Sequence, residues 1–320
     1  MHVSEFLEHH FRHFNARELV AAARSYRQFT DDGGKMIVTL AGAMSTGELG
    51  LSLSEMIRAG KVHAICCTAA NLEEDMFNLV AHDEYRIIEN WRSLSAEDEE
   101  TLRDQGFNRV TDTCIPETVM RHLEKRLIRR WTEVANEGRS QLPSQFMFDL
   151  LDDPELAEHY QVPREHSWVA AAKDQNIPIF VPGFEDSTLG NIFAARVVDG
   201  TVPSHSAVAS GTEQMEQLIH WYRDQSAESP IGFFQIGGGI AGDFAICVVP
   251  LMIQDLQLDV PYWSYFCQIS DAVTSYGGYS GAVPNEKITW HKLAKTAPKF
   301  MIQSDASIVA PLVFAYVLGW

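Results

Sequence analysis

The sequence predicts an α/β fold in which a mainly parallel sheet carries helices on both faces. Two observations predict it: short apolar runs rich in β-branched residues recur along the 320-residue chain, and segments with helical periodicity separate them. The runs are mostly apolar and do not alternate with polar residues, which is typical of strands that are buried on both sides. Strands that alternate with helices connect as right-handed β-α-β units and so form a parallel sheet.

Six segments are expected to be strands, at 36–40, 64–67, 177–181, 232–236, 264–269 and 300–303. Five are expected to be helices, at 47–59, 117–136, 168–174, 211–224 and 242–256. The second helix is the best marked, because Pro116 suits a first-turn position and Glu117 meets the positive end of the helix dipole. The stretch 141–164 contains three prolines and is expected to be an excursion between strands.

Length and composition indicate one large domain, residues 31–320, preceded by an N-terminal helical segment, residues 1–30. That segment could pack against a neighbouring subunit or cover the active-site entrance. It carries charges where a signal peptide needs an apolar stretch, and no apolar run reaches the ~20 residues that span a bilayer. A cytoplasmic protein with no membrane contact is therefore expected.

The charge and the cysteines limit the possible partners. The formal net charge of −18 argues against nucleic acid, and favours cationic small molecules or solubility alone. The five cysteines include no C-x-x-C pair, so neither a disulfide framework nor a metal site is expected.

Ligands of open α/β sheets bind outside the carboxyl ends of the strands. Five turns placed there contain glycines or acids, at 68–75, 182–191, 237–242, 270–281 and 304–307. The turn 237–242 matches G-x-G-x-x-G between a strand and a helix, where backbone N–H groups can approach a pyrophosphate. Helix capping would equally explain the acids, and tight connections would explain the glycines.

Lys292 ends the unusual string SGAVPNEKITWHK, in which Glu286 and Trp290 precede it. A lysine forms imines when its ammonium is desolvated and loses its proton near neutral pH. Trp290 could supply the apolar wall that such desolvation needs. A surface role remains the ordinary interpretation of a single lysine among many.

Five strings together resemble deoxyhypusine synthase: CTAANLEED, EDSTLGN, GGGIAGDF, SGAVPNEKITWHK and SDASIVAPL. They occur in that family's order, and the similarity is greatest to its bacterial, deoxyhypusine-synthase-like branch. The resemblance implies a Rossmann-like fold, NAD as cofactor, and a homotetramer with active sites between subunits. It also implies the reaction: spermidine is oxidised, its aminobutyl group passes to a lysine as an imine, and an acceptor amine takes it before the stored hydride reduces the product.

By resemblance, Lys292 is the imine-forming lysine, Trp290 a wall beside the polyamine, and Glu286 a carboxylate that holds a substrate ammonium. The positions at which the family contacts NAD are Thr46, Thr68, Ala69, Glu74, Asp186, Gly238, Gly239, Ser280 and Asp305. This set agrees with charge, because carboxylates suit ribose hydroxyls and glycine N–H groups suit a pyrophosphate.

Four positions depart from the family pattern. Asp243 stands where the family has a general-base histidine, and His291 stands where it has a glycine beside the lysine. Either side chain could take the amine proton. Asn191 and Tyr279 replace two acids that grip spermidine, which should weaken the binding of a tricationic donor. A diamine such as putrescine would need fewer carboxylates.

Three functions remain open on the sequence. The first is an aminobutyl transferase that forms homospermidine from putrescine and/or spermidine, and the altered polyamine positions favour it. The second is deoxyhypusine formation on a translation-factor lysine, which would make a protein the acceptor. The third is a catalytically silent homologue that retains NAD.

Overall fold

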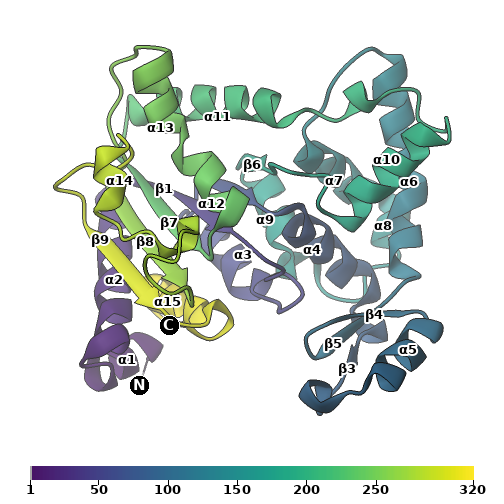
Figure 1. The fold of residues 1–320 in the computed structure, drawn as a ribbon, viewed down its shortest axis with the longest axis horizontal. Helices are drawn as coiled ribbons and strands as arrows, with labels where there is room; N and C mark the ends of the chain where they lie inside the picture. Colours follow the sequence, from purple (N-terminus) through teal and green to yellow (C-terminus); the bar gives the residue numbers. More distant parts are fainter. Residues whose placement is uncertain (1) are drawn as a thin grey trace.

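The computed structural model describes residues 2–320, and its centre is a six-stranded sheet with the order β6-β2-β1-β7-β8-β9 (Figure 1). Neighbouring strands of this sheet all run parallel. They are β1 (Lys35–Leu40), β2 (Ala64–Cys67), β6 (Ile179–Phe180), β7 (Ile231–Ile236), β8 (Tyr265–Ser270) and β9 (Lys299–Gln303). Each of the six predicted strands is present, and the predicted α/β fold is confirmed.

Successive residues of the strands face two separate hydrophobic cores. In β1, Val38 and Leu40 belong to one core and Ile37 to the other. The first core includes α2 (Phe14–Asp31), α3 (Gly50–Arg58), α4 (Ala69–Ala81), α9 (Trp168–Asp174) and α15 (Ala306–Leu318). The second includes α11 (Gly211–Ser226), α12 (Gly239–Ile246) and α13 (Val248–Pro250). Both faces of the sheet are covered, which explains why its strands are apolar without alternation.

The N-terminal helices complete one face of the chain's own sheet. α1 (Val3–His10) and α2 lie beside α15, and α2 also contacts β9. Two buried tyrosines fix α2 in place: the Tyr265 hydroxyl donates to Ala22 O at 3.0 Å, and the Tyr26 hydroxyl donates to Lys61 O at 2.7 Å. Residues 14–31 are therefore part of the first core.

A small antiparallel sheet was not predicted. It consists of β3 (Arg86–Ile87), β4 (Phe107–Val110) and β5 (Thr113–Pro116) in the order β3-β5-β4, and α5 (Ala96–Asp104) packs on it. This unit lies at the lower right of Figure 1. Its strands are two to four residues long, and β3 and β4 each contain an arginine, so these two lack the apolar runs that identified the central strands. β5 is buried, but its end at Ile115 and Pro116 also suits a helix start.

The small sheet also corrects the start of the best-marked helix. Ile115 and Pro116 pair with β4, opposite Asn108 and Phe107, and α6 (Val119–Asn136) begins only after Thr118. The prediction that this helix begins at 115–117 is wrong. Proline fixes a φ that suits the last residue of a strand as well as the first turn of a helix, so the sequence signal was ambiguous.

The predicted helix 242–256 is also corrected. α12 begins three residues earlier, at Gly239, and the segment continues as α13 and a π-helical turn at Leu251–Asp255. Pro250 interrupts the helical hydrogen-bond pattern at this point. Within the stretch 141–164 lie two helices, α7 (Pro143–Leu151) and α8 (Pro154–Ala157). The remaining helices are α10 (Thr188–Val198) and α14 (Glu286–Thr289).

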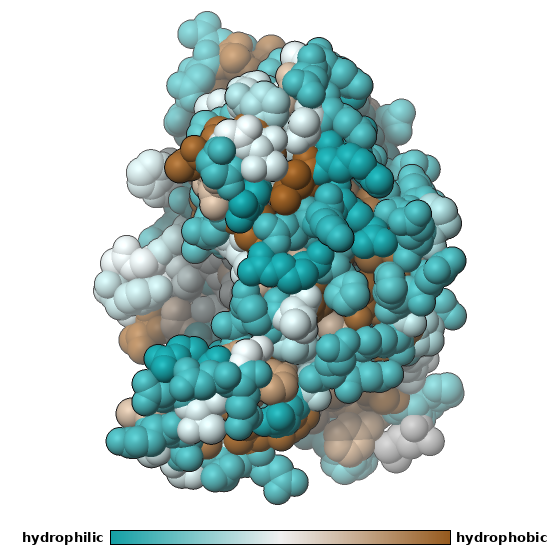
Figure 2. Space-filling model, turned by 90° about the vertical axis from the view of Figure 1, so that its right-hand side faces the viewer, coloured by the Kyte–Doolittle hydropathy of each residue, from teal (hydrophilic) through white to brown (hydrophobic). Residues whose placement is uncertain are grey.

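The face of the molecule shown in Figure 2 is mostly hydrophilic, with hydrophobic residues in small, separate patches. This distribution agrees with a chain in which 21% of the residues are charged. Across residues 2–320, none of the helices combines the length and the apolar character needed to cross a membrane.

Candidate active site

The order of the strands places a crevice between β1 and β7. The chain continues from β1 to β2 on one side and from β7 to β8 on the other, so the connections diverge at this point. Such a switch point leaves an opening at the carboxyl ends of the two strands. The loops are close there: a Cβ on Gly237 would lie 2.8 Å from the Cβ of Ala41.

The glycine turn lines this crevice. Gly237 and Gly239 have φ angles of 76° and 60°, which favour glycine. A Cβ on Gly238 would lie 1.7 Å from Ser280 Oγ, so these two predicted cofactor residues are in direct contact, whereas nothing lies within 4 Å of a Cβ on Gly239. The turn therefore has open space beside the N-terminus of α12.

The loops after β1 and β2 bring four further predicted cofactor residues to the same edge of the sheet. Thr46 N donates to Glu74 Oε2 at 3.2 Å, and Thr68 caps α4, of which Ala69 is the first residue. Burial raises the pKa of the Glu74 carboxyl to about 7. A carboxyl group with this pKa changes its charge near neutral pH.

Asn71 holds these loops together, and the sequence analysis gave it no role. Its side-chain amide donates to Gly42 O at 2.9 Å and to Thr68 Oγ1 at 2.8 Å, and its Oδ1 accepts from Ser45 N at 3.0 Å. Asn71 is fully buried. The only sequence signal for this role is an asparagine among the small and apolar residues that begin α4.

The remaining predicted cofactor acids are exposed. Asp186 precedes α10, and Glu73 holds that helix start by accepting from Leu189 N at 2.7 Å. Gly183, in the same loop, lies against Ile240 of α12. Asp305 caps α15 by accepting from Ser307 N at 2.8 Å. Each acid follows its strand at the sheet edge that carries the crevice.

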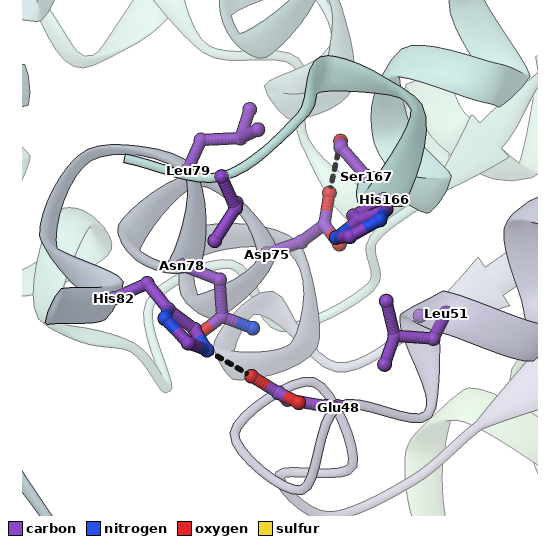
Figure 3. A pocket seen from close by; sticks show the side chains of 10 residues that line it. Glu48, Leu51, Asp75, Asn78, Leu79, His82, His166 and Ser167 are labelled. Atoms are coloured by element: carbon purple, nitrogen blue, oxygen red, sulfur yellow. Dashed lines mark hydrogen bonds and ion pairs between the residues drawn. The ribbon is translucent and has the colours of Figure 1, made fainter. Parts of the chain in front are cut away.

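Asp75, the third acid of the run after β2, points into a different cavity of about 190 Å³ (Figure 3). Its carboxylate accepts from the hydroxyl of Ser167 and from the backbone N–H groups of Trp168 and Val169. His82 and Glu48 also line this cavity and are hydrogen-bonded, with 2.6 Å between Nε2 and Oε1. Asp75 thus fixes α4 to α9.

Lys292 lies in a larger cavity, of about 550 Å³, which Asp243 of α12 also lines. The residue is only 8% exposed, and its Nζ lies 3.0 Å from Asp243 Oδ1. The lining residues are Asp243, Cys247, Pro250, Leu251, Gln254, Asp255, Tyr279, Ala282, Glu286, Lys287, Trp290 and Lys292. The structure therefore brings the predicted nucleophile together with one of its two predicted bases.

Three predicted substrate residues line the same cavity, but their environments differ. The Tyr279 hydroxyl donates to Gln235 Oε1 at 3.0 Å, and burial, then the charge of Asp243, raises the pKa of Tyr279 well above its usual value. Glu286, the first residue of α14, is exposed, and Trp290 is 67% exposed. The cavity is consequently open on the side of Trp290.

Two predicted residues lie outside this cavity. His291 has a left-handed backbone, with φ 54°, and its Nδ1 lies 3.3 Å from the Tyr262 hydroxyl. Asn191 is exposed, and its amide donates to Glu185 O, 3.0 Å away in its own loop. Neither side chain contacts Lys292 within this chain. Between residues 2 and 320, no group of three or more His, Cys, Asp or Glu side chains could hold a metal ion.

Lys287 is a cavity residue that the sequence analysis missed. It is 2% exposed, and burial, followed by the positive charge of Lys292, lowers its pKa to about 8. Its Nζ lies 4.7 Å from the ring centre of Phe266 and 5.1 Å from that of Tyr279. Nothing in the sequence distinguished this lysine from those on the surface.

Fold and site together define a Rossmann-like α/β protein, with a glycine-lined crevice beside a cavity that contains a buried lysine. The model of the family Deoxyhypusine synthase matches residues 7–317, so the chain belongs to this family. Its members carry out NAD-dependent aminobutyl transfer.

Individual relatives are distant but match along almost the whole chain. The deoxyhypusine synthase-like protein of Cyanothece sp. is 27% identical, over 99% of this chain and 79% of its own. The probable deoxyhypusine synthase 2 of Methanosarcina mazei is 26% identical, over 97% of this chain and 85% of its own. A solved structure, of a putative deoxyhypusine synthase from Entamoeba histolytica, is similar in fold, with a TM-score of 0.57 and 13% identity over 99% of this chain and 92% of that one.

Proposed function

We propose that this protein is an NAD-dependent aminobutyl transferase that forms homospermidine from putrescine and/or spermidine through an imine on Lys292. One observation carries the proposal: α12 begins at the glycine turn and carries Asp243, the partner of Lys292, one helical turn later. The crevice for a dinucleotide and the cavity for an amine are thus joined by a single helix.

The crevice suits NAD. The open space beside Gly239 at the start of α12 would admit a pyrophosphate, and the Glu74 carboxylate would accept hydrogen bonds from ribose hydroxyls. Thr46, Thr68, Ala69, Asp186, Gly238, Ser280 and Asp305 would complete the binding site. When bound, NAD supplies a hydride acceptor that can later return the hydride.

The cavity residues act on the amine. Asp243 holds the Lys292 ammonium and would take its proton, because an uncharged amine is required for attack on an imine carbon. The Glu286 carboxylate would bind the free ammonium of the donor, and Trp290 would cover its methylene chain. His291, which contacts Tyr262 instead, is the second candidate for the proton acceptor.

A small diamine is the favoured acceptor because the cavity offers few negative charges for a polyamine. Tyr279, at one position where the family has an acid, stays uncharged at neutral pH, since its pKa is raised. Asn191, at the other, already uses its amide within its own loop. Two missing carboxylates disfavour a tricationic substrate more than a dicationic one.

The site is proposed to lie between subunits of a homotetramer in the cytoplasm. Trp290, Tyr276 and Val273 are 67%, 58% and 68% exposed. Apolar residues exposed beside a cavity are typical of a surface that another subunit covers. A covering subunit would also close the cavity on the side of Trp290.

Incubation with NAD and radiolabelled putrescine or spermidine, followed by borohydride, tests the proposal. We expect label on the protein, and homospermidine in the solution without any protein acceptor. In a parallel reaction that also contains the translation factor, a mass gain only on that factor would show deoxyhypusine synthesis instead. Absence of label with every polyamine, in protein that binds NAD, would identify a silent homologue.

A further inference from the structure

Lys287 is a buried cation in the wall of the larger cavity. The residue is 2% exposed, lines that cavity, and forms no ion pair with a carboxylate of residues 2–320. Its Nζ donates a long hydrogen bond, of 3.4 Å, to Ala282 O. The carboxylates of Asp243 and Glu286 act on it only through space. An ammonium buried with so little compensation costs stability, and such a group in a cavity is a candidate for a functional role.

The ring of Tyr279 relates this charge to the reacting lysine. Lys287 Nζ lies 5.1 Å from the ring centre, and Lys292 Nζ lies 5.4 Å from it. Burial, followed by the positive charge of Lys292, lowers the pKa of Lys287 to about 8. With this pKa, about nine-tenths of the Lys287 amine is charged at pH 7. Lys287 thus holds a positive charge close to the amine that is proposed to carry the aminobutyl group.

A positive charge at this place acts differently on amines of different charge. Putrescine is a dication at neutral pH, and spermidine is a trication. An ammonium of the substrate that lies about 8 Å from a charged lysine in a partly buried site loses affinity on the order of 5-fold. Tyr279 supplies no negative charge to offset this repulsion, because burial, then the charge of Asp243, raises its pKa well above the usual value.

We propose that the buried ammonium of Lys287 selects substrates by charge: it disfavours tricationic amines and makes diamines such as putrescine the preferred substrates of the cavity. The selection acts through space, so it requires no contact between Lys287 and the substrate. It is compatible with the imine on Lys292, because Lys287 keeps its proton while Lys292 gives its own to Asp243. The inference rests on the proposed function and narrows the substrates proposed there to diamines.

Equilibrium binding tests the selection separately from turnover. The protein is saturated with NADH, which cannot accept a hydride, and the affinities of spermidine and octamethylenediamine are measured by calorimetry at pH 7. These two amines have the same chain length, but spermidine has a charged secondary amine where the diamine has a methylene group. The ratio of their dissociation constants therefore reports how the cavity responds to one added positive charge.

Lys287→Met should improve the binding of spermidine relative to the diamine on the order of 5-fold. Lys287→Arg, which keeps the charge, should not. Lys295→Met is the matched control, because it removes an exposed lysine outside the cavity. The difference between the wild type and Lys287→Met should fall below about 2-fold at pH 9, where Lys287 has lost most of its charge. The charged and titratable groups that face Lys287 and set this pH are Lys292, Glu286, Asp243, Cys247, Asp255 and Tyr279.

A ratio that Lys287→Met leaves within about 2-fold of the wild type would overturn the inference and leave the proposed function intact. An equal change in Lys295→Met, or a difference that persists at pH 9, would also overturn it, because neither depends on the charge of Lys287. If the methionine variant does not fold, the wild type and Lys287→Arg decide. Their ratios should separate between pH 7 and 9, since only arginine keeps its charge, and equal ratios would overturn the inference. If the wild type binds neither amine, the inference fails together with the proposed function.

Discussion

Replacing Lys287 by methionine should stabilise the protein at neutral pH. The side chain is buried and its ammonium forms no ion pair with a carboxylate of residues 2–320, and methionine keeps the length of the side chain without the charge. The apolar contacts with Phe266 and Tyr279 would be retained, because a thioether packs well against aromatic rings.

The magnitude follows from the pKa of Lys287, which is about 8 instead of 10.5. Each step of one in pKa corresponds to about 1.4 kcal/mol, so the buried ammonium destabilises the fold by roughly 3 kcal/mol at pH 7. Loss of the cation–π contacts offsets roughly 1 kcal/mol of this. We therefore expect Lys287→Met to raise the free energy of unfolding by about 2 kcal/mol at pH 7.

The pH dependence provides a separate check. Between about pH 8 and 10.5 the unfolded chain holds the Lys287 proton and the folded chain does not, so wild-type stability rises with pH in this window. The advantage of the methionine variant should consequently shrink by about 1 kcal/mol between pH 7 and 9.

Urea unfolding at fixed protein concentration measures both quantities, with Lys287→Arg as the control that keeps the charge. The arginine variant should not show the gain at pH 7, and its own stability should lack the rise with pH that the wild type owes to Lys287, because arginine stays protonated. A methionine variant less stable than the wild type at pH 7, or equally favoured at both pH values, would refute the reasoning.

Three further predictions concern the crevice and its partner cavity. Gly238→Ala should weaken NAD binding by about 10- to 100-fold, measured by calorimetry, because the new methyl group would displace Ser280; unchanged affinity would place the cofactor elsewhere. The affinity for NAD should rise as pH increases through about 7, where Glu74 ionises to the form that accepts ribose hydroxyls, and Glu74→Gln should remove this dependence. Asp243→Asn should lower the rate of transfer by about 100-fold with NAD affinity retained, and a normal rate would remove Asp243 from the handling of the Lys292 proton.

The central sheet was predictable because its strands are buried on both faces, which gives mostly apolar runs without alternation, such as Met36–Leu40. The small sheet was not, since its strands are only two to four residues long and two of them mix arginine with apolar residues. The predicted helix start at Pro116 was wrong because the fixed φ of proline is compatible with the end of a strand as well as with the start of a helix. In both cases burial and pairing partners, which local sequence does not contain, decided the outcome.

Part of the candidate site was likewise predictable from the sequence, and part was not. Gly238 and Ser280, predicted from turns 42 residues apart in sequence, prove to be in contact, and Lys292 meets Asp243. The distinct environment of Lys287 was not predictable, because it depends on two aromatic rings that lie far from it in sequence or across a turn, and on a fold that gives its ammonium no direct ion pair within residues 2–320. The direction of the His291 side chain depends on a left-handed backbone that a non-glycine residue seldom adopts.

The placement of Asp243 on α12 limits how such a protein can diversify. Four residues of helix rise only about 6 Å, so the turn at Gly239 and the acid at Asp243 belong to one rigid rod. A substitution that tilts α12 disturbs both ends of the helix, whereas the segment 279–291 lines the cavity but does not belong to α12. New substrate ranges should therefore arise through changes in that segment, while α12 keeps the distance between the glycine turn and Asp243 fixed.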